Sequence, residues 1–132
     1  PRSGRMDRPI AKVPDFFNHY QIADTGRPSR TEYKVLSEFT YEETPFSLVR
    51  LKLQTGRTHQ IRVHMASLSH PLLGDSIYGH EGFLGFDRAA LHSFEITCQL
   101  PGHQDLAVFS SEMPEDFQKM IAKSINFSST LI

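Results

Sequence analysis

Apolar and polar residues alternate most regularly in residues 47–53, whose sequence is SLVRLKL. Successive side chains of a strand point to opposite faces, so this period of two predicts a strand with an apolar face toward the core and an outward face that carries Arg50 and Lys52. Residues 31–36, TEYKVL, are rich in β-branched and aromatic side chains and predict another strand. We expect these first strands to need partners from outside the chain.

A helical period follows this strand. Ile61, Met65 and Leu68 recur at positions i, i+4 and i+7, which predicts an amphipathic helix that ends near Ser69. Thr58 stands where an N-cap residue is expected, because a threonine hydroxyl can accept a hydrogen bond from a free backbone N–H of the first turn.

Short strand-like segments return toward the C-terminus. Residues 92–100 and 107–109 are expected to pair as antiparallel strands across the turn at Pro101 and Gly102. A short helix is predicted to start at Pro114, because proline suits the first helical turn. Its inward-facing residues are expected to be Phe117, Met120 and Ile121.

The order of these elements predicts the fold class. Residues 1–30 contain several prolines and few periodic apolar positions, so we expect an extended, wrapping loop with short strand pieces. Residues 31–124 are expected to hold the sheet and helices, and residues 125–132 a tail. Strands with interspersed short helices, and without a regular βαβ alternation, favour an α+β domain with a mainly antiparallel, mixed sheet.

Composition limits the class of protein. A chain of 132 residues with 39% hydrophobic residues fits one domain. The formal net charge is -1, yet residues 44–74 contain cationic side chains and no Asp or Glu, so a local basic surface is expected. No apolar run approaches the roughly 20 residues that span a bilayer, and we expect no membrane partner. Cys98 is the only cysteine, which excludes an intrachain disulfide and favours a reducing, cytoplasmic setting.

The segment TGRTHQIRVH, residues 55–64, carries the strongest chemical signal. It joins a turn to a helix N-terminus, where free backbone N–H groups favour an anion such as phosphate or carboxylate. Arg57 and His59 add donors there, and Arg62 lies off the apolar stripe, where it can reach a carboxylate or phosphate. Taken without further evidence, the same residues also fit an ordinary solvated, basic helix face.

Two other kinds of site are weaker alternatives. A metal site at His59, His64 and His70 is disfavoured, because the i, i+5 spacing of the first two places them on different helix faces. A serine hydrolase is disfavoured because the sequence has no G-x-S-x-G motif and His92 has only the adjacent Ser93. We therefore expect no metal and no hydrolytic triad.

Three segments, GRTHQIRVH, HPLLGDSIYG and RAALHSFEI, closely resemble conserved parts of the RluA-type RNA pseudouridine synthases. Upstream, RMDRPI and GRPSRTEYKVL are similar to the same family, so the resemblance covers residues 4–118. It implies a pseudouridine synthase-like fold, with residues 1–132 as the C-terminal part of one catalytic domain. It also implies isomerisation of uridine in ribosomal or transfer RNA, without cofactor or metal.

The resemblance assigns roles to individual residues. It implies that Arg62 pairs with the catalytic aspartate of the family, as a supporting residue. It implies that Leu91 packs against the active centre, although burial alone fits an ordinary core leucine equally well. Residues that match the motif, and are expected to line the site or lock its loop, are Arg57, Thr58, His59, Gln60 and His64. Arg50 and Lys52 are expected to contact RNA phosphates.

The HRLD-like segment that carries the catalytic aspartate of this family does not occur in these 132 residues. Asp75 matches a motif position of turn-forming character, and we expect no catalytic role for it. We expect an N-terminal half of the same domain as a partner, together with structured RNA, and we expect the isolated chain to be inactive. The alternative is a non-catalytic RNA-binding module, or a fragment that complements its other half.

Overall fold

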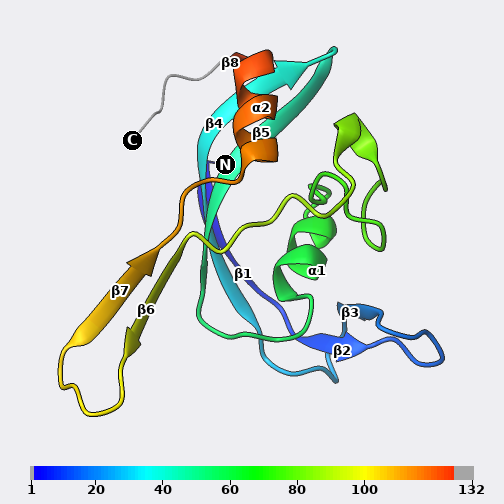
Figure 1. The fold of residues 1–132 in the computed structure, drawn as a ribbon. Coiled ribbons are helices and arrows are strands. Elements are labelled where there is room, and N and C mark those ends of the chain that lie inside the picture. The colour runs from blue at the N-terminus through cyan, green and yellow to red at the C-terminus, as the bar shows by residue number, and fades with distance from the viewer. Residues whose placement is uncertain (1, 127–132) are drawn as a thin grey trace.

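The computed structural model describes residues 2–126 and is built around one long hairpin (Figure 1). Strands β4 (Arg30–Tyr41) and β5 (Thr44–Leu53) pair antiparallel along their length. Glu42 and Glu43 connect them, and both adopt the left-handed conformation that a two-residue hairpin turn requires, with φ of 48° and 65°. The strands predicted at 31–36 and 47–53 are therefore confirmed, and both are longer than predicted.

The other edge of β4 is paired inside the chain. Strand β1 (Ser3–Asp7) pairs with its first half and β8 (Ile125–Asn126) with its second half, which gives the order β1-β4-β5 with β8 beside β4. The expectation that the first strands need partners from outside the chain is thus wrong for β4. The reason is that β1 comes from the segment expected to be loop with short strand pieces, and β8 from the first two residues of the expected tail 125–132, of which residues 127–132 lie outside the described part of the chain.

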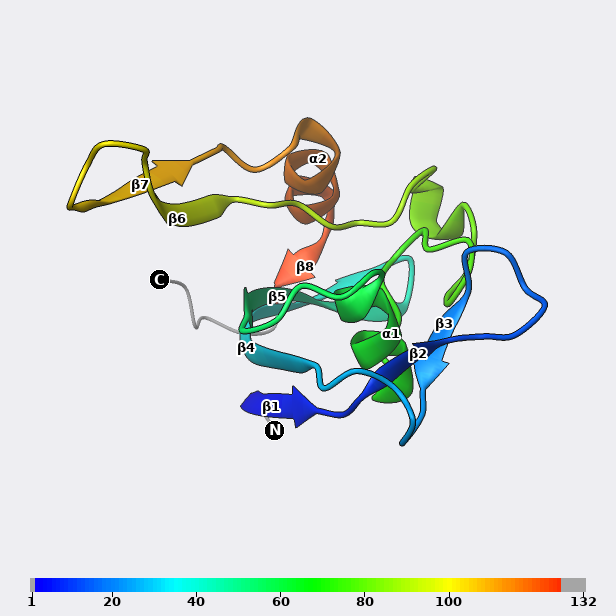
Figure 2. The ribbon, with the colours of Figure 1, turned by 90° about the horizontal axis from the view of Figure 1, so that it is seen from below.

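Strands β2 (Ile10–Lys12) and β3 (Tyr20–Ile22) form a small second hairpin. It lies beside helix α1 (Gln60–Ser67), as both ribbon views show (Figures 1 and 2). The prediction of short strand pieces within residues 1–30 is therefore confirmed.

Helix α1 differs from its prediction in two respects. His59, in the left-handed conformation with φ of 56°, precedes the helix, and no side chain caps it, so the predicted Thr58 cap is wrong. The buried positions are Gln60, Val63, His64 and Met65, so Met65 of the predicted stripe is buried as expected, whereas Ile61 and Leu68 are only half-buried. The apolar pattern failed here because two polar residues of the helix bury their side chains to bind the neighbouring backbone.

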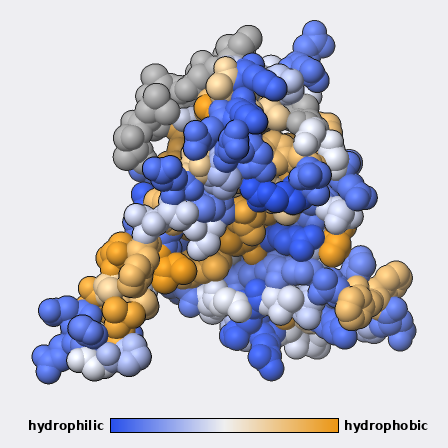
Figure 3. Space-filling model, viewed as in Figure 1, coloured by the Kyte–Doolittle hydropathy of each residue, from blue (hydrophilic) through white to orange (hydrophobic). Residues whose placement is uncertain are grey.

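After α1 the chain forms an irregular segment with the single-turn helix η1 (Phe83–Gly85), and then a projecting hairpin of β6 (Glu95–Gln99) and β7 (Leu106–Ser110) (Figure 1). Ile96 lies opposite Phe109 and Cys98 opposite Ala107, which confirms the predicted antiparallel pairing. Hydrophobic side chains gather on the surface of this hairpin (Figure 3).

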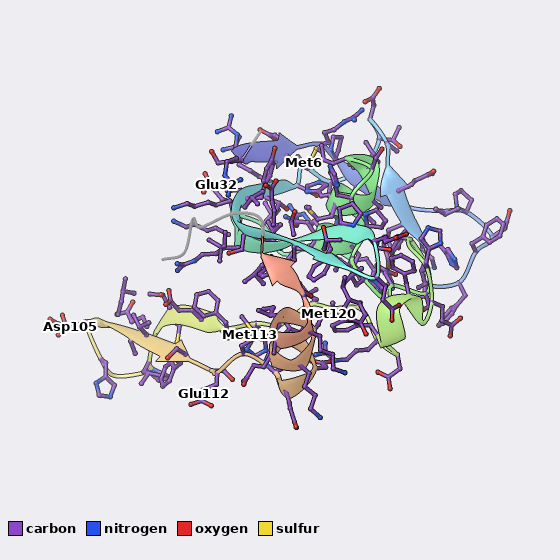
Figure 4. The ribbon with its side chains drawn as sticks, turned by 90° about the horizontal axis from the view of Figure 1, so that it is seen from above. Met6, Glu32, Asp105, Glu112, Met113 and Met120 are labelled. Atoms are coloured by element: carbon purple, nitrogen blue, oxygen red, sulfur yellow. The ribbon has the colours of Figure 1, made fainter. Side chains whose placement is uncertain are left out.

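Helix α2 (Glu115–Lys123) follows Pro114, as predicted, and buries Met120 near β4. Figure 4 shows Met120 on α2 and Met6 on the sheet, which belong to the apolar core. All strand pairs within residues 2–126 are antiparallel, so the predicted α+β class with a mainly antiparallel sheet is confirmed. No helix in this range is long and apolar enough to span a bilayer. The buried apolar residues are Met6, Ile10, Phe39, Val63, Met65, Phe86 and Met120.

Candidate functional site

Arg62 and Asp75 form an ion pair with two parallel hydrogen bonds. Arg62 Nε donates to Oδ2 of Asp75 at 2.9 Å, and Nη2 donates to Oδ1 at 2.7 Å. The Asp75 side chain is fully buried, whereas 20% of the Arg62 side chain is exposed. This fork geometry fixes the plane of the guanidinium as well as its position.

A tight turn holds the Asp75 carboxylate in place. Its Oδ1 accepts hydrogen bonds from the backbone N–H groups of Ile77 and Tyr78, at 3.0 and 3.1 Å. The turn-forming character predicted for Asp75 is confirmed. Gly74 makes the close approach feasible, because its φ is 73° and a Cβ there would lie 2.2 Å from the carbonyl oxygen of Arg88.

The charges of the pair stabilise each other. Burial acts to raise the pKa of Asp75, but the hydrogen bonds from Arg62, Tyr78 and Ile77 outweigh it, so that the pKa lies below its ordinary value. The hydrogen bond to Asp75 raises the pKa of Arg62. Both groups are therefore ionised at neutral pH.

Tyr78 links this pair to the β2–β3 hairpin. Its hydroxyl accepts the backbone N–H of Tyr20 at 2.9 Å and lies 2.8 Å from Nδ1 of His59, to which it can donate. Its ring centroid lies 5.2 Å from Cζ of Arg62, in cation–π range. Arg62, Asp75, Tyr78, His59 and Tyr20 are called the Arg62 cluster below.

His59 is held neutral in this cluster. Burial and the nearby charge of Arg62 lower the pKa of His59. Burial also raises the pKa of Tyr78, so its phenol keeps its proton at neutral pH. The neutral imidazole can accept the Tyr78 proton in a hydrogen bond, and Arg62 is the one cation of the cluster.

One amino group of Arg62 remains available. Within residues 2–126, Nη1 makes no hydrogen bond, while Nε and Nη2 are bound to Asp75. The partly exposed guanidinium can therefore bind a second anion without breaking the pair. A carboxylate or a phosphate oxygen would fit this position, because either accepts charge-assisted hydrogen bonds.

Gln60 lies in the interior and organises the turn before α1. Its Oε1 accepts hydrogen bonds from Thr55 Oγ1 and from the backbone N–H of Arg57, at 2.8 and 3.0 Å. Its Nε2 donates to the carbonyl oxygen of Arg30 and to Thr31 Oγ1, at 2.9 and 3.0 Å. These four bonds satisfy the side chain completely, so Gln60 locks the loop onto β4.

His64 is also fully buried and fully bonded. Its Nδ1 lies 2.8 Å from Thr31 Oγ1, and its Nε2 lies 3.0 Å from the carbonyl oxygen of Arg8. A carbonyl oxygen only accepts, so Nε2 carries the proton and Thr31 donates to Nδ1. Burial lowers the pKa of His64. Neither nitrogen is free for a metal or for RNA in this arrangement.

Arg57, Thr58 and Leu91 lie outside the Arg62 cluster. Arg57 Nε donates to the carbonyl oxygen of Pro28 at 3.1 Å, and Thr58 is exposed at the turn before the helix. Leu91 is half-buried, and the neighbouring Ala90 donates its N–H to the carbonyl oxygen of Leu73 at 2.7 Å. The segment with Leu91 therefore runs beside the turn that positions Asp75.

Arg50 and Lys52 form a separate basic surface on β5. Lys34 of β4 lies opposite Arg50. Glu32, labelled in Figure 4, lies opposite Lys52 and is the carboxylate that faces these cations. Cζ of Arg50 lies 4.8 Å from the ring of Phe94. Within residues 2–126, no hydrogen bond, ion pair or ring contact joins this surface to the Arg62 cluster.

The sequence analysis missed the roles of Asp75, Tyr78 and Tyr20. One signal was available for Asp75, namely its place after a glycine in a tight turn. Nothing in the pattern indicated Tyr20, because it lies far from Tyr78 along the chain and only the fold brings the two together.

Comparison with known proteins gives consistent matches. Residues 1–67 match the family model described as RNA pseudouridylate synthase. The ribosomal large subunit pseudouridine synthase D of Haemophilus ducreyi is 35% identical over 133 residues, a match that covers 91% of this chain and 40% of the relative. The protein of the same name from Escherichia coli K12 is 34% identical, with 88% and 42% covered. The chain thus spans about two fifths of the length of these relatives.

Solved structures match as well. Human RNA pseudouridylate synthase domain containing 1 superimposes with a TM-score of 0.78 at 28% identity, over 97% of this chain and 55% of that structure. Human RNA pseudouridylate synthase domain containing 4 has a TM-score of 0.68 at 21% identity, which supports the fold alone. The fold of this chain is shared with both proteins.

Proposed function

Since the chain belongs to the RNA pseudouridylate synthase family, we propose that it forms part of the catalytic domain of an RNA pseudouridine synthase. The reaction breaks the bond between uracil N1 and ribose C1′, turns the base, and joins C5 to C1′. The C5 proton leaves and N1 gains a proton, so atoms balance without a co-reactant. Neither a metal nor a cofactor is required.

In this proposal Arg62 supports a catalytic aspartate that another part of the protein supplies. The observation that carries the proposal is the fixed guanidinium of Arg62, with Nε and Nη2 bound to Asp75 and Nη1 uncommitted. A carboxylate bound at Nη1 would stay ionised and keep one rotamer, because a nearby cation lowers its pKa. Arg62 is therefore a supporting residue, and the aspartate would be the nucleophilic or ion-pairing group.

The proposed substrate is structured RNA, and ribosomal RNA in particular. The relatives from Haemophilus ducreyi and Escherichia coli are named for the large ribosomal subunit. We extend the proposed substrate to transfer RNA. We also propose a cytoplasmic location for the protein. The basic surface of Arg50 and Lys52, with Lys34 of β4 beside it, would bind phosphates and so help offset the few kcal/mol that it costs to flip a uridine out of its stack.

The proposed partner is the N-terminal half of the same catalytic domain. The chain covers 55% of a solved relative, so the relative contains further chain that can cover exposed surfaces. The β6–β7 hairpin offers apolar groups on both of its faces: Ile96 and Phe109 lie opposite each other on one face and are 56% and 51% exposed, and Leu106 and Val108 lie on the other face and are 68% and 62% exposed. Apolar side chains gathered on one projecting hairpin are typical of a surface that another element covers.

The test uses the full-length protein and tritium release from RNA labelled at uridine C5. We expect Arg62→Ala and Arg62→Lys to lose nearly all isomerisation, because neither side chain can bind Asp75 and a second carboxylate in a fork. Arg30→Ala is the matched control, since Arg30 forms an exposed pair with Asp7 outside the cluster. Normal activity of both Arg62 variants would contradict the assignment.

The isolated chain provides a second test. Residues 1–132 lack the HRLD-like segment, so we expect no tritium release from this chain alone and recovery of activity when the N-terminal half is added. Isomerisation by the isolated chain would contradict the proposed division of roles. RNA binding by the full-length protein without any isomerisation would favour the non-catalytic RNA-binding module instead.

A further inference from the structure

Two aromatic residues stand exposed at the tip of the β2–β3 hairpin. Phe16 is 60% exposed and Phe17 is 91% exposed. The loop projects from the body of the molecule beyond both strands (Figure 1), and hydrophobic side chains are visible at its end (Figure 3). A single exposed apolar residue is ordinary, but two consecutive exposed rings contribute little to the core and call for another explanation.

The tip is an ordered turn. The N–H of Val13 donates to the carbonyl oxygen of His19 at 2.8 Å, and Nδ1 of His19 donates to the carbonyl oxygen of Phe17 at 2.7 Å. Asp15 and Asn18 adopt the left-handed conformation, with φ of 65° and 58°, which these residue types tolerate well. The ordered backbone therefore places both rings in solvent, and less backbone entropy is lost when a ligand binds than at an unstructured loop.

Ring contacts connect this tip to the Arg62 cluster. The ring of Phe16 lies 5.8 Å from that of His19, and the ring of His19 lies 6.5 Å from that of Tyr78. Tyr78 in turn lies 5.2 Å from Cζ of Arg62. Phe16 thus lies at the outer end of a row of planar groups that begins at the candidate active site, and Phe17 follows it in the same turn.

We propose that Phe16 and Phe17 form a stacking platform for unpaired bases of the RNA, next to the uridine that enters the site. The proposal rests on the function proposed above. Aromatic side chains bind unstacked bases of any sequence, because every base has a π face. A nucleotide that is flipped leaves its neighbours without a stacking partner, and a platform beside the site would replace that contact.

The alternative occupant is protein, since the N-terminal half could cover the same rings. The two cases differ in what truncation of the rings would change. Loss of a base-stacking contact weakens RNA binding and leaves the free protein equally stable. Loss of a buried protein contact lowers the melting temperature of the free protein.

The experiment uses the full-length protein and fluorescence anisotropy with single-stranded oligouridylate over a series of salt concentrations. We expect Phe16→Ala and Phe17→Ala each to weaken binding about 10-fold, in line with base–aromatic stacking. The slope of log affinity against log salt should stay unchanged, because no phosphate contact is lost. Lys52→Ala is the contrasting control, for which the slope should fall by about 1.

Two conservative variants test whether stacking is the cause. Phe17→Trp should retain or strengthen binding, because indole stacks on bases, whereas Phe17→Leu should bind as weakly as Phe17→Ala. Equal binding by Phe17→Leu and the unmodified protein would overturn the stacking platform.

Further outcomes separate this proposal from the proposed function. Unchanged affinity of the double variant Phe16→Ala, Phe17→Ala, in a protein that isomerises uridine, would overturn the platform and leave the function intact. A melting temperature lowered by several degrees in that variant would assign the rings to a protein contact and also overturn the platform. A full-length protein that neither binds nor isomerises RNA would overturn both.

Discussion

Asp75 accepts two hydrogen bonds from the guanidinium of Arg62 and leaves Nη1 of that group without a partner inside residues 2–126. The carboxylate thereby orients the guanidinium and leaves its Nη1 amino group able to bind another anion. Because Asp75 is fully buried and is itself bound by two backbone N–H groups, it cannot turn away from Arg62 without leaving those groups unpaired. Asp75 is thus a positioning residue for Arg62.

Replacement of Asp75 tests this relationship. We expect Asp75→Asn to reduce the free energy of unfolding by about 3 kcal/mol, because it removes one partner of a buried pair. Isomerisation should fall more than binding, since the variant misplaces Arg62 at the reacting centre. Urea unfolding and single-turnover tritium release measure the two effects. Asp116→Asn removes one partner of an ion pair that is 41% and 39% exposed, and should cost less than about 1 kcal/mol.

Gly74 offers a test in which backbone strain and steric clash are separated. Gly74→Ala should destabilise the protein by more than about 3 kcal/mol, because the added Cβ would lie 2.2 Å from a carbonyl oxygen of Arg88 in a residue with φ of 73°. Gly102→Ala has a similar φ of 79° but nothing within 4 Å of the new Cβ, so it should cost about 1 kcal/mol. Equal effects of the two variants in thermal unfolding would contradict the close approach at Gly74.

The pKa of His64 predicts how stability depends on pH. Burial lowers the folded-state pKa below the ordinary value of 6.5, so the unfolded chain takes up the proton first as the pH falls. The stability from neutral His64 is present above pH 6.5 and decreases as the pH drops below it, by at most about 1.4 kcal/mol per pH unit for one proton.

His59 contributes in the same direction, because its pKa is also lowered. Unfolding by urea at a series of pH values from 8 to 5 should show this loss. His64→Gln should be less stable at pH 8, and its free energy of unfolding should depend less on pH. In the double variant His59→Gln, His64→Gln this pH dependence should be weaker still. An unchanged slope in His64→Gln would show that His64 is not the titrating group.

The hydroxyl of Tyr78 is expected to matter for stability separately from its ring. Tyr78→Phe leaves the N–H of Tyr20 without a partner and should cost roughly 1 to 3 kcal/mol. The ring contact with Arg62 would remain, so the isomerisation rate should fall less than in Tyr78→Leu. Tyr41→Phe is a suitable control, because the Tyr41 hydroxyl makes no hydrogen bond within residues 2–126. A similar loss of stability in the two phenylalanine variants would contradict the role of the Tyr20 bond.

The sequence by itself determined the regular elements and the chemical type of the site. The alternation in residues 47–53 specifies β5, and Pro114 with the apolar residues after it specifies α2, because these signals depend on neighbours in the chain. The motif around Arg62 placed a cation at the start of a helix for the same local reason.

Only the tertiary structure decided what these residues contact. Asp75 reaches Arg62 because the turn after α1 folds back on the helix, and Tyr20 reaches Tyr78 because the β2–β3 hairpin packs beside it. Gln60 and His64 carry polar side chains that a helical pattern assigns to solvent. They are buried because hydrogen-bond partners on β4 and at Arg8 replace water, and those partners are distant in sequence.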